Sequence, residues 1–306
     1  MNDSFDIIII GSGPAGLAAG LYTSRSKLHT LILERESFGG KLSNRDLIEN
    51  YPSYPDGILG PELVSRMLDQ VINYRPEIQL GEVGSIQING KDKVVETSFG
   101  EYAGSAIIIA GGAHNKALRV PGEQEFLDRG VFHCATCDGP KFTDKVVAVV
   151  GGGDAGITEG LLLSKLAAKV VIIEMLPKCT AIKILQERAF SNPRIEIKCS
   201  TKVEGILGEE TVQWIKLLDM KTHLRSNLQV DGILIYTGLE PNTNYLRGFV
   251  PLDNEGYVLV NKKMETKIPG IFAAGDIRHD SAWQIATAVG DGATAAISAE
   301  RFLAKN

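Results

Sequence analysis

The hydrophobic positions of this chain fall into short continuous runs, each followed by a glycine cluster or an acidic residue. Residues 6–10 form one such run, a helical pattern follows over 17–24, and a second run over 30–33 ends at Glu34. Continuous apolar runs of this length are typical of strands that are buried on both faces of a parallel sheet. The pattern therefore predicts a strand–helix–strand unit at the start of the chain.

The same pattern recurs near the middle of the chain. Residues 145–150 form an apolar run, a helical pattern extends to Ala168, and a further run over 170–173 ends at Glu174. Strands that alternate with helices indicate an α/β fold with parallel sheets. We therefore expect two copies of one unit within the chain.

The segments around these units predict the remaining elements. Before the second copy we expect a ligand-covering loop over 47–61, a helix over 62–74, an antiparallel insertion over 77–102 and a buried strand over 105–110. After it we expect short strands and turns over 196–219, buried strands over 230–236 and 270–274, and a helix over 283–304. Residues 118–123 and 237–242 interrupt regular structure and mark the expected crossings between two domains.

Two glycines lie inside the last expected helix. Gly290 and Gly292 each cost about 1 kcal/mol relative to alanine in a helix interior. Close packing against another backbone or a flat ligand would explain them, and a break in the helix is the alternative.

A glycine-rich turn closes the first strand of each copy. The two turns read Gly11-Ser12-Gly13-Pro14-Ala15-Gly16 and Gly151-Gly152-Gly153-Asp154-Ala155-Gly156. Such turns let the backbone approach a pyrophosphate, which then lies at the N-terminus of the following helix. Glu34 and Glu174 each follow the first glycine by 23 residues, where a ribose hydroxyl needs an acceptor. The repeat predicts two dinucleotides with electron transfer between them; two lobes that share one ligand are the alternative.

Composition and charge narrow the class of protein. The chain has 306 residues, of which 44% are hydrophobic, and this is enough for two ordinary domains. A net charge of −5 gives no reason to expect nucleic acid or a membrane surface as a partner. The four cysteines do not form a disulfide scaffold, and no signal peptide or spanning segment is evident. We therefore expect a cytoplasmic protein.

Two of the cysteines lie in the segment His133-Cys134-Ala135-Thr136-Cys137-Asp138-Gly139. A pair at this spacing can close as a disulfide, and Asp138 can carry the proton that a leaving thiolate needs. Zinc is disfavoured because Cys179 and Cys199 do not form a second pair of this spacing, and no metal site is expected. The motif favours redox chemistry, with a chance pair as the alternative.

Together these motifs resemble the low-molecular-weight thioredoxin reductases. The residues that carry the resemblance are the first glycine motif, Glu49-Asn50-Tyr51-Pro52, Pro121-Gly122-Glu123, Cys134-Ala135-Thr136-Cys137-Asp138, the second glycine motif and Gly275-Asp276. The resemblance implies two Rossmann-like domains of three-layer ββα architecture, the second inserted into the first. Residues 1–116 and 245–306 would bind FAD, and residues 117–244 would form an NAD(P)-binding-like domain with the disulfide. It also implies a homodimer and a thioredoxin- or glutaredoxin-like protein partner.

The same resemblance assigns roles by position. For FAD it implies Gly11, Gly13, Pro14, Ala15, Gly16, Glu34, Gly40, Lys41, Asn50, Ala110, Gly111, Gly275, Asp276, Gln284 and Ile285. For a pyridine nucleotide it implies Gly151, Gly153, Asp154, Ala155, Gly156 and Glu174. Cys137 would meet the flavin, Cys134 would attack the partner's disulfide, and Asp138 would supply the proton.

The chain departs from the family pattern where the electron donor would bind. Family members carry arginines that grip the 2′-phosphate of NADPH, whereas this strand ends in Glu174, which favours the free 2′-hydroxyl of NADH and disfavours NADPH. Near the flavin, Lys41 replaces a glutamine and Trp283 replaces an arginine. Trp283 either stacks near the flavin and blocks the nicotinamide, or is an ordinary core residue at the start of a helix. The predicted function is therefore an FAD-dependent thioredoxin-disulfide reductase that uses NADH. The alternatives are ferredoxin or another non-nicotinamide donor, and a nucleotide-binding redox sensor.

Overall fold

The computed structural model describes residues 4–305 and divides into two compact units. The first unit contains the described residues up to His114 and those from Glu240 onward; the second is Asn115–Leu239. The chain thus leaves the first unit between 114 and 115 and re-enters it between 239 and 240, a few residues before each expected boundary. The terminal parts of the predicted first domain, 1–3 and 306, lie outside the described residues.

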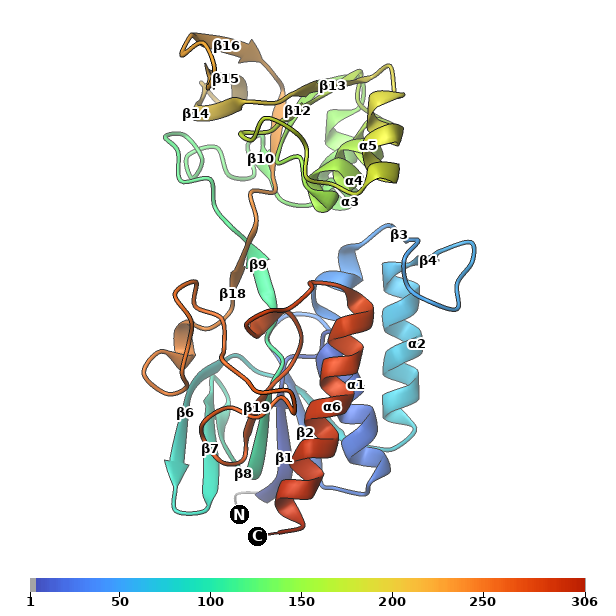
Figure 1. The fold of residues 1–306 in the computed structure, drawn as a ribbon, viewed down its shortest axis with the longest axis vertical. Coiled ribbons are helices and arrows are strands. Elements are labelled where there is room, and N and C mark those ends of the chain that lie inside the picture. The colour runs from blue at the N-terminus through green and yellow to red at the C-terminus, as the bar shows by residue number, and fades with distance from the viewer. Residues whose placement is uncertain (1–3, 306) are drawn as a thin grey trace. The chain divides into compact units, whose positions relative to one another are not determined.

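The first unit is built on a seven-stranded sheet of order β5-β2-β1-β8-β7-β6, with β19 paired to β8 (Figure 1). Its elements, with the two short strands β9 and β18 at its boundary, are β1 (Ser4–Ile10), α1 (Pro14–Arg25), β2 (Thr30–Glu34), the 3-10 helix η1 (Gly40–Asn44), β3 (Leu47–Ile48), β4 (Ile58–Leu59), α2 (Gly60–Ile72), β5 (Glu77–Leu80), β6 (Val83–Asn89), β7 (Asp92–Thr97), β8 (Gly100–Ile109), β9 (Ala113–Asn115), β18 (Leu239–Pro241), η3 (Asn244–Leu246), β19 (Ile271–Ala273), η4 (Gly275–Ile277) and α6 (Ile285–Leu303). Strand β1 pairs in parallel with β2 and β8, and β19 pairs in parallel with β8.

The core of this unit explains the apolar runs. Residues Ile7 and Ile9 pack toward α1 and α6, while Ile8 and Ile10 pack into a second cluster on the opposite face of the sheet. Both faces of β1 are therefore covered, and each fully buried isoleucine contributes roughly 1.5–3 kcal/mol of stability. Figure 1 shows α1, α2 and α6 side by side along one face of the sheet.

Gly292 lies where α6 passes against α1, and the helix is continuous through it. A Cβ atom at this position would collide with the backbone carbonyl of Ala15. Close packing, one of the two explanations offered by the sequence, therefore accounts for Gly292. Gly290 has open space around the corresponding position, and nothing in the structure explains it.

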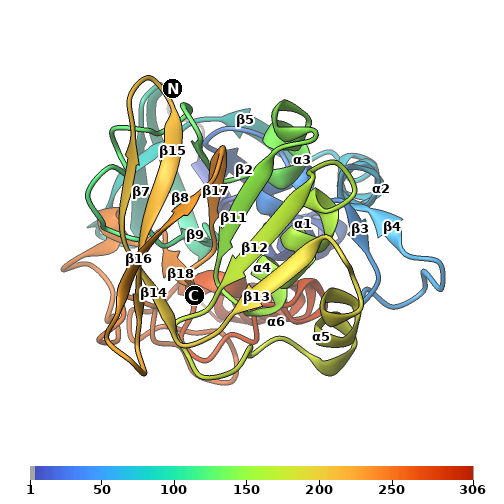
Figure 2. The ribbon, with the colours of Figure 1, turned by 90° about the horizontal axis from the view of Figure 1, so that it is seen from above.

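The second unit repeats the architecture with a five-stranded parallel sheet of order β10-β17-β11-β12-β13. Its elements are β10 (Val131–Phe132), α3 (Ala135–Asp138), η2 (Gly139–Phe142), β11 (Val146–Val150), α4 (Asp154–Leu163), β12 (Lys169–Ile173), α5 (Lys183–Phe190), β13 (Ile195–Lys198), β14 (Thr201–Gly208), β15 (Val212–Asp219), β16 (Arg225–Gln229) and β17 (Gly232–Ile235). Figure 2 shows β11, β12 and β13 side by side, with α4 and α5 beside them. The three-stranded sheet β14-β15-β16 packs on the parallel sheet through an apolar cluster that includes Ile206 and Ile215. The predicted fold class, two Rossmann-like units of three-layer ββα architecture with the second inserted into the first, is confirmed.

Three expected elements differ from those observed. The segment 77–102 is not wholly antiparallel: β5 joins β2 in parallel, because α2 carries the chain across the sheet before it. The helix of the second copy ends at Leu163 rather than Ala168, where the Ser164 hydroxyl bonds back to the carbonyl of Leu161. The expected loop over 47–61 contains a short antiparallel pair, β3 and β4. Within the described residues, no helix is both long enough and apolar enough to cross a membrane.

Candidate functional site

The first glycine turn joins β1 to α1. Gly11 has φ of +101°, and a Cβ atom on it would collide with the carbonyl of Ala110, so the turn requires glycine. A Cβ on Gly16 would collide with the carbonyl of Gly11, whereas one on Gly13 would find nothing within 4 Å. Gly11 and Gly16 thus serve backbone packing, while Gly13 faces open space at the N-terminus of α1, where a pyrophosphate is favoured.

Glu34 is fixed to this turn by hydrogen bonds at the end of β2. Its Oε2 accepts from the backbone N–H of Ser12 at 2.8 Å and from the Ser12 hydroxyl at 2.7 Å. Its Oε1 accepts from the N–H groups of Arg35 at 2.9 Å and Glu36 at 3.2 Å. The carboxylate is therefore held in one orientation beside the glycine turn. Ser12 was not selected from the sequence, although its place between Gly11 and Gly13 is a signal that could have found it.

Two further glycines predicted for FAD, Gly40 and Gly275, lie close to the same turn within the first unit. A Cβ on Gly40 would lie 3.5 Å from the Cα of Gly13, and one on Gly275 would lie 2.8 Å from the Cβ of Ala15. The side-chain amide of Asn50 donates to the Gln284 side chain at 2.9 Å, which links the loop after β3 to the start of α6. The predicted set lies in the glycine turn and the start of α1, at the end of β2, just after β8, in η1 and η4, and in these two segments. It comprises Gly11, Gly13, Pro14, Ala15, Gly16, Glu34, Gly40, Lys41, Asn50, Ala110, Gly111, Gly275, Asp276, Gln284 and Ile285.

Two opposite charges flank this turn. Burial lowers the pKa of Lys41 to about 8, with the nearby Asp276 carboxylate opposing that shift and Arg45 adding to it. Burial also raises the pKa of Asp276, and Lys41 opposes this second shift. These opposite charges interact with each other and follow directly after Gly40 and Gly275, the two glycines that approach the turn.

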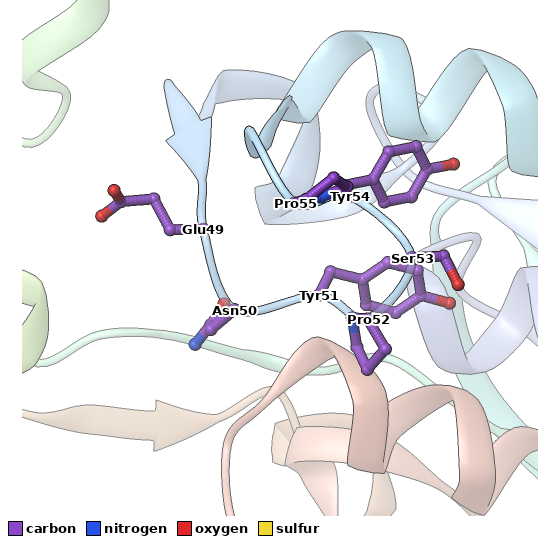
Figure 3. A pocket seen from close by; sticks show the side chains of 7 residues that line it. All are labelled: Glu49, Asn50, Tyr51, Pro52, Ser53, Tyr54 and Pro55. Carbon is purple, nitrogen blue, oxygen red and sulfur yellow. The ribbon is translucent and has the colours of Figure 1, made fainter.

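The loop that carries Asn50 is hollowed into a pocket of about 490 Å³, lined by residues 49–55. Figure 3 shows the Tyr51 and Tyr54 rings on one side of the loop and the Glu49 side chain extending on the other. The two tyrosine rings stack with centroids 6.1 Å apart, and burial raises the pKa of Tyr51. This stacking fixes the loop that positions Asn50.

Trp283 immediately precedes the Gln284 cap of α6. Its side chain is 51% exposed, so its interpretation as a buried core residue at the helix start is wrong. The indole lies 6.3 Å from the Tyr257 ring, at a second pocket that also contains Asp253 and His279. Asp276 and Lys41 do not line this pocket.

The second glycine turn reproduces the first. Gly151 has φ of +122°, and a Cβ on Gly156 would collide with the Gly151 carbonyl. A Cβ on Gly153 would approach only the hydroxyl of Thr180, at 3.6 Å. The N–H of Gly152 donates to Glu174 Oε2 at 2.6 Å, and the N–H of Leu176 donates to Glu174 Oε1 at 2.8 Å. Glu174 is therefore oriented at its turn as Glu34 is at the first. Four predicted residues, Gly151, Gly153, Ala155 and Gly156, lie in this turn and in the first residues of α4.

Asp154, the fifth residue predicted in this turn, begins α4. Its Oδ1 accepts the N–H of Ile182 at 2.8 Å. The N–H groups of Thr180 and Ala181 donate to the Gly152 carbonyl at 3.0 and 3.1 Å. The segment after β12 is thereby fastened over the second turn.

The Cys134–Cys137 pair forms a disulfide at the start of α3. The N–H of Cys137 donates to the Cys134 sulfur at 3.1 Å, a contact that favours a thiolate at Cys134 once the disulfide opens. Asp138 pairs with Lys141 at 2.7 Å, a partner that the sequence analysis missed although it lies three residues away. The cysteine pair is anchored by Ala135, which is buried in the core of the second unit.

A disulfide carried on a parallel α/β unit with a dinucleotide-type turn defines a disulfide oxidoreductase. The chain matches the family model "Pyridine nucleotide-disulphide oxidoreductase" over residues 5–292. It is 43% identical over 301 residues to a thioredoxin reductase of Bacillus subtilis (strain 168), covering 98% of this chain and 95% of that protein. A crystal structure of Lactococcus lactis thioredoxin reductase matches with a TM-score of 0.97 and 39% identity, covering 99% of this chain and 100% of that chain. The structure of T. acidophilum thioredoxin reductase matches with a TM-score of 0.94 and 34% identity, covering 97% and 98% of the two chains.

The chain therefore belongs to the pyridine nucleotide-disulphide oxidoreductases and, among them, to the low-molecular-weight thioredoxin reductases. The family prediction and the enzyme prediction, a thioredoxin-disulfide reductase, are confirmed. Membership of this family implies FAD as cofactor and thioredoxin as partner.

Proposed function

We propose that this enzyme takes electrons from NADH and uses them, through FAD and the Cys134–Cys137 disulfide, to reduce a thioredoxin- or glutaredoxin-like protein. The observation that carries the choice of donor is the matched geometry of Glu34 and Glu174. Each carboxylate accepts the backbone N–H of the second residue in its glycine turn, at 2.8 and 2.6 Å. An acidic residue held at this place binds the ribose hydroxyls and repels a 2′-phosphate.

The residues present fit both dinucleotides. Gly13 and Gly153 each leave free the space that a Cβ would fill, and the helix that follows each turn directs unpaired N–H groups at that space. In the first unit, Gly13, Glu34, Lys41 and Asp276 would hold FAD. When bound, this cofactor supplies a two-electron carrier between the nicotinamide and the disulfide.

The chain's own residues account for the thiol chemistry. Cys137 would receive the electron pair, which breaks the disulfide and releases Cys134 as the thiolate that attacks the partner's disulfide. The Cys137 N–H stabilises negative charge on Cys134, and Asp138 would carry the proton while Lys141 holds its carboxylate. These roles follow the family resemblance and are consistent with the geometry of α3.

The remaining assignments rest on the same resemblance. We propose a homodimer whose FAD-binding domain comprises 1–116 and 245–306, and whose inserted domain, 117–244, binds the nicotinamide cofactor. The free thiols of Cys179 and Cys199 suit a reducing compartment, which supports a cytoplasmic location.

The donor is tested by anaerobic titration of the FAD-loaded enzyme with NADH and NADPH in separate experiments, followed by the visible absorbance of the flavin. We expect NADH to bleach the flavin band at concentrations where NADPH does not. Glu174→Arg should reverse or erase that preference, whereas Glu187→Arg on the exposed side of α5 is the matched control and should not change it.

Two results would contradict this proposal. Bleaching by reduced ferredoxin or dithionite, but by neither nicotinamide, would assign the enzyme to the non-nicotinamide alternative. An enzyme that binds NADH yet fails to reduce any thioredoxin-like protein would favour the redox-sensor alternative.

A further inference from the structure

Two thiols outside the redox motif lie together at the second glycine turn. Cys179 follows β12 and is buried; Cys199 follows β13 and is partly buried. The two strands are neighbours, with Ile173 opposite Lys198, and their extensions stay paired through the Ser200 N–H, which donates to the Leu176 carbonyl at 2.8 Å. Cys199 packs against the buried apolar cluster that contains Cys179, and its thiol contributes to the raised pKa of Cys179. Adjacent strands thus bring together two sulfurs that are 20 residues apart in the sequence.

This thiol pair touches the nucleotide-recognition elements. A Cβ on Gly152 would lie 3.0 Å from the Cys179 sulfur and 2.9 Å from Glu174 Oε2, so the thiol and the carboxylate sit against the same residue of the turn. The next two residues after Cys179 donate to the Gly152 carbonyl. A movement of the Cys179 sulfur toward Cys199 therefore shifts a group that packs directly on the turn and on Glu174.

We propose that Cys179 and Cys199 are a second redox-active dithiol, which closes in exchange with a low-molecular-weight disulfide and thereby weakens nucleotide binding at the second glycine turn. The site is separate from Cys134 and Cys137. Only the effect on nucleotide binding rests on the proposed use of NADH; closure of the pair does not.

The reaction is balanced as a thiol–disulfide exchange. Cys199, the more accessible sulfur, attacks a disulfide RSSR to give a Cys199–SR mixed disulfide and one thiolate, which takes the Cys199 proton. The Cys179 sulfur then attacks the Cys199 sulfur and expels the second RS⁻, which takes the Cys179 proton. Two protein thiols are oxidised, one RSSR is reduced to two RSH, and excess reduced thiol reverses the change.

The order of these steps follows from the environment of Cys179. Burial, with Cys199 and Glu174 adding to the effect, raises the pKa of Cys179 to about 12, so this sulfur is protonated at neutral pH. A protonated, buried thiol reacts poorly with a disulfide from solution. Cys179 should therefore react only after Cys199 has formed a mixed disulfide next to it. Closure should therefore be slow near pH 7 and faster as the pH rises.

The test uses the FAD-loaded wild-type enzyme, in which Cys134 and Cys137 are already paired. It is incubated without oxygen at pH 8.5 with excess glutathione disulfide, then denatured, alkylated and mapped by mass spectrometry. We expect a disulfide-linked peptide that joins Cys179 to Cys199. Recovery of both thiols in alkylated form, or of a glutathione adduct that persists on Cys199, would overturn the dithiol.

Binding is measured on the same samples with NAD⁺, which occupies the nicotinamide site without reducing the flavin. Closure should raise the Kd for NAD⁺ at least about fivefold, the lower end of typical coupling between sites, and dithiothreitol should restore it. The Cys199→Ser variant should bind NAD⁺ equally before and after treatment. A closed disulfide with unchanged NAD⁺ affinity would overturn the coupling. If the reduced enzyme binds neither NAD⁺ nor NADH, the proposed donor fails while the peptide map still decides the thiol pair.

Discussion

The two glycine turns of this protein share a backbone but differ in the segments that cover them. Gly11 and Gly151 have φ of +101° and +122°, and each turn fixes a glutamate through the N–H of its second residue. The common features are those that a close approach of strand, helix and phosphate requires, so they are repeated in both units. A glycine turn therefore identifies a dinucleotide site but does not say which dinucleotide it holds.

The differences lie in the covering segments. At the first turn, the Ser12 hydroxyl fills the position beside Glu34, and Lys41 brings a cation close to the turn. At the second turn, Gly152 has no side chain, and the Cys179 sulfur lies beside Glu174 in place of a hydroxyl. The residues that cover this turn are the uncharged Thr180 and Ala181. The proposed specificity and regulation would thus be carried by residues that lie outside the glycine motif.

The largest expected effect concerns a feature that only the second unit has, the disulfide. Cys134→Ser removes the sulfur that we propose attacks the partner, so reduction of a thioredoxin-like protein should fall at least about a thousandfold. FAD binding in the first unit should be unchanged, which the flavin absorbance of the purified variant measures. Cys199→Ser is the matched control for the loss of a sulfur and should retain activity; substantial activity in Cys134→Ser would refute the dithiol mechanism.

Substitution of Gly13 or Gly153, the glycine of each turn that faces ligand space, should impair the binding of one dinucleotide at a time. Gly13 has φ of −66° and Gly153 has φ of −83°, so alanine is compatible with both backbones. Its methyl group would enter the ligand space and should weaken binding about a hundredfold, since overpacking costs up to about 3 kcal/mol. Gly13→Ala should lose FAD, and Gly153→Ala should lose NADH while keeping FAD; equilibrium dialysis measures each affinity.

The control for this pair is Gly16→Ala. Its Cβ would collide with the Gly11 carbonyl, so this variant should unfold at a lower temperature instead of showing a selective loss of ligand. If Gly13→Ala binds FAD normally, the space beside that residue does not hold the pyrophosphate.

The two glutamates provide a finer comparison. A glutamine keeps an oxygen for the N–H of Ser12 or Gly152 but loses the charge that a ribose hydroxyl favours. Loss of a hydrogen bond to a charged group costs about 1.5–3 kcal/mol, so the affinity should fall by about tenfold to a hundredfold. Glu174→Gln should raise the Kd for NADH and leave FAD binding unaltered. Glu34→Gln should raise the Kd for FAD and leave NADH binding unaltered. Equal effects of both variants on one dinucleotide would favour a single ligand shared between the turns.

The sequence was sufficient for those parts of the molecule that a local pattern specifies. Both strand–turn–helix units are predictable from the apolar runs of β1 and β11 and from the spacing between glycine and glutamate. These patterns lie within short stretches of the sequence. Helix α4 ends at Leu163, where the Ser164 hydroxyl bonds to the Leu161 carbonyl, a contact that periodicity cannot reveal. The place of β5 beside β2 depends on the path of the whole α2 crossover.

The candidate site shows the same limit. The residues of each glycine turn are adjacent in sequence, so a motif finds them. The contact between Cys179 and Cys199 and the half-exposed Trp283 depend on how distant segments pack, and no spacing rule encodes them. The sequence shows Lys41 as a departure from the family, but the lowering of its pKa follows from burial and from the nearby Arg45, against the opposing effect of Asp276.

The smallest expected effect is a pH dependence that only the first turn should show. The pKa of Lys41 is about 8 without ligand, chiefly because of burial. The negative charge of a bound pyrophosphate should raise this pKa, so FAD binding takes up a proton and weakens as the pH rises above 8. The loss should be roughly threefold to fivefold between pH 8 and 9, since Lys41 is already half deprotonated at pH 8 and each pKa unit corresponds to a tenfold change in affinity. Reconstitution of the FAD-free protein at several pH values measures it.

The stability of the FAD-free protein should change in the opposite direction over the same range. Between the folded pKa of about 8 and the ordinary value of 10.5, the unfolded chain holds a proton on Lys41 that the folded chain has lost. Stability rises with pH wherever the unfolded state binds more protons, so the destabilisation caused by burying this lysine is relieved progressively from pH 8 to pH 10.5. Lys41→Gln should remove the pH dependence of both FAD affinity and stability. The affinity for NADH should not depend on pH in this way, because the residues over the second turn, Thr180 and Ala181, are uncharged. An FAD affinity that stays level from pH 8 to pH 9 in the wild type would mean that the Lys41 ammonium does not face the pyrophosphate.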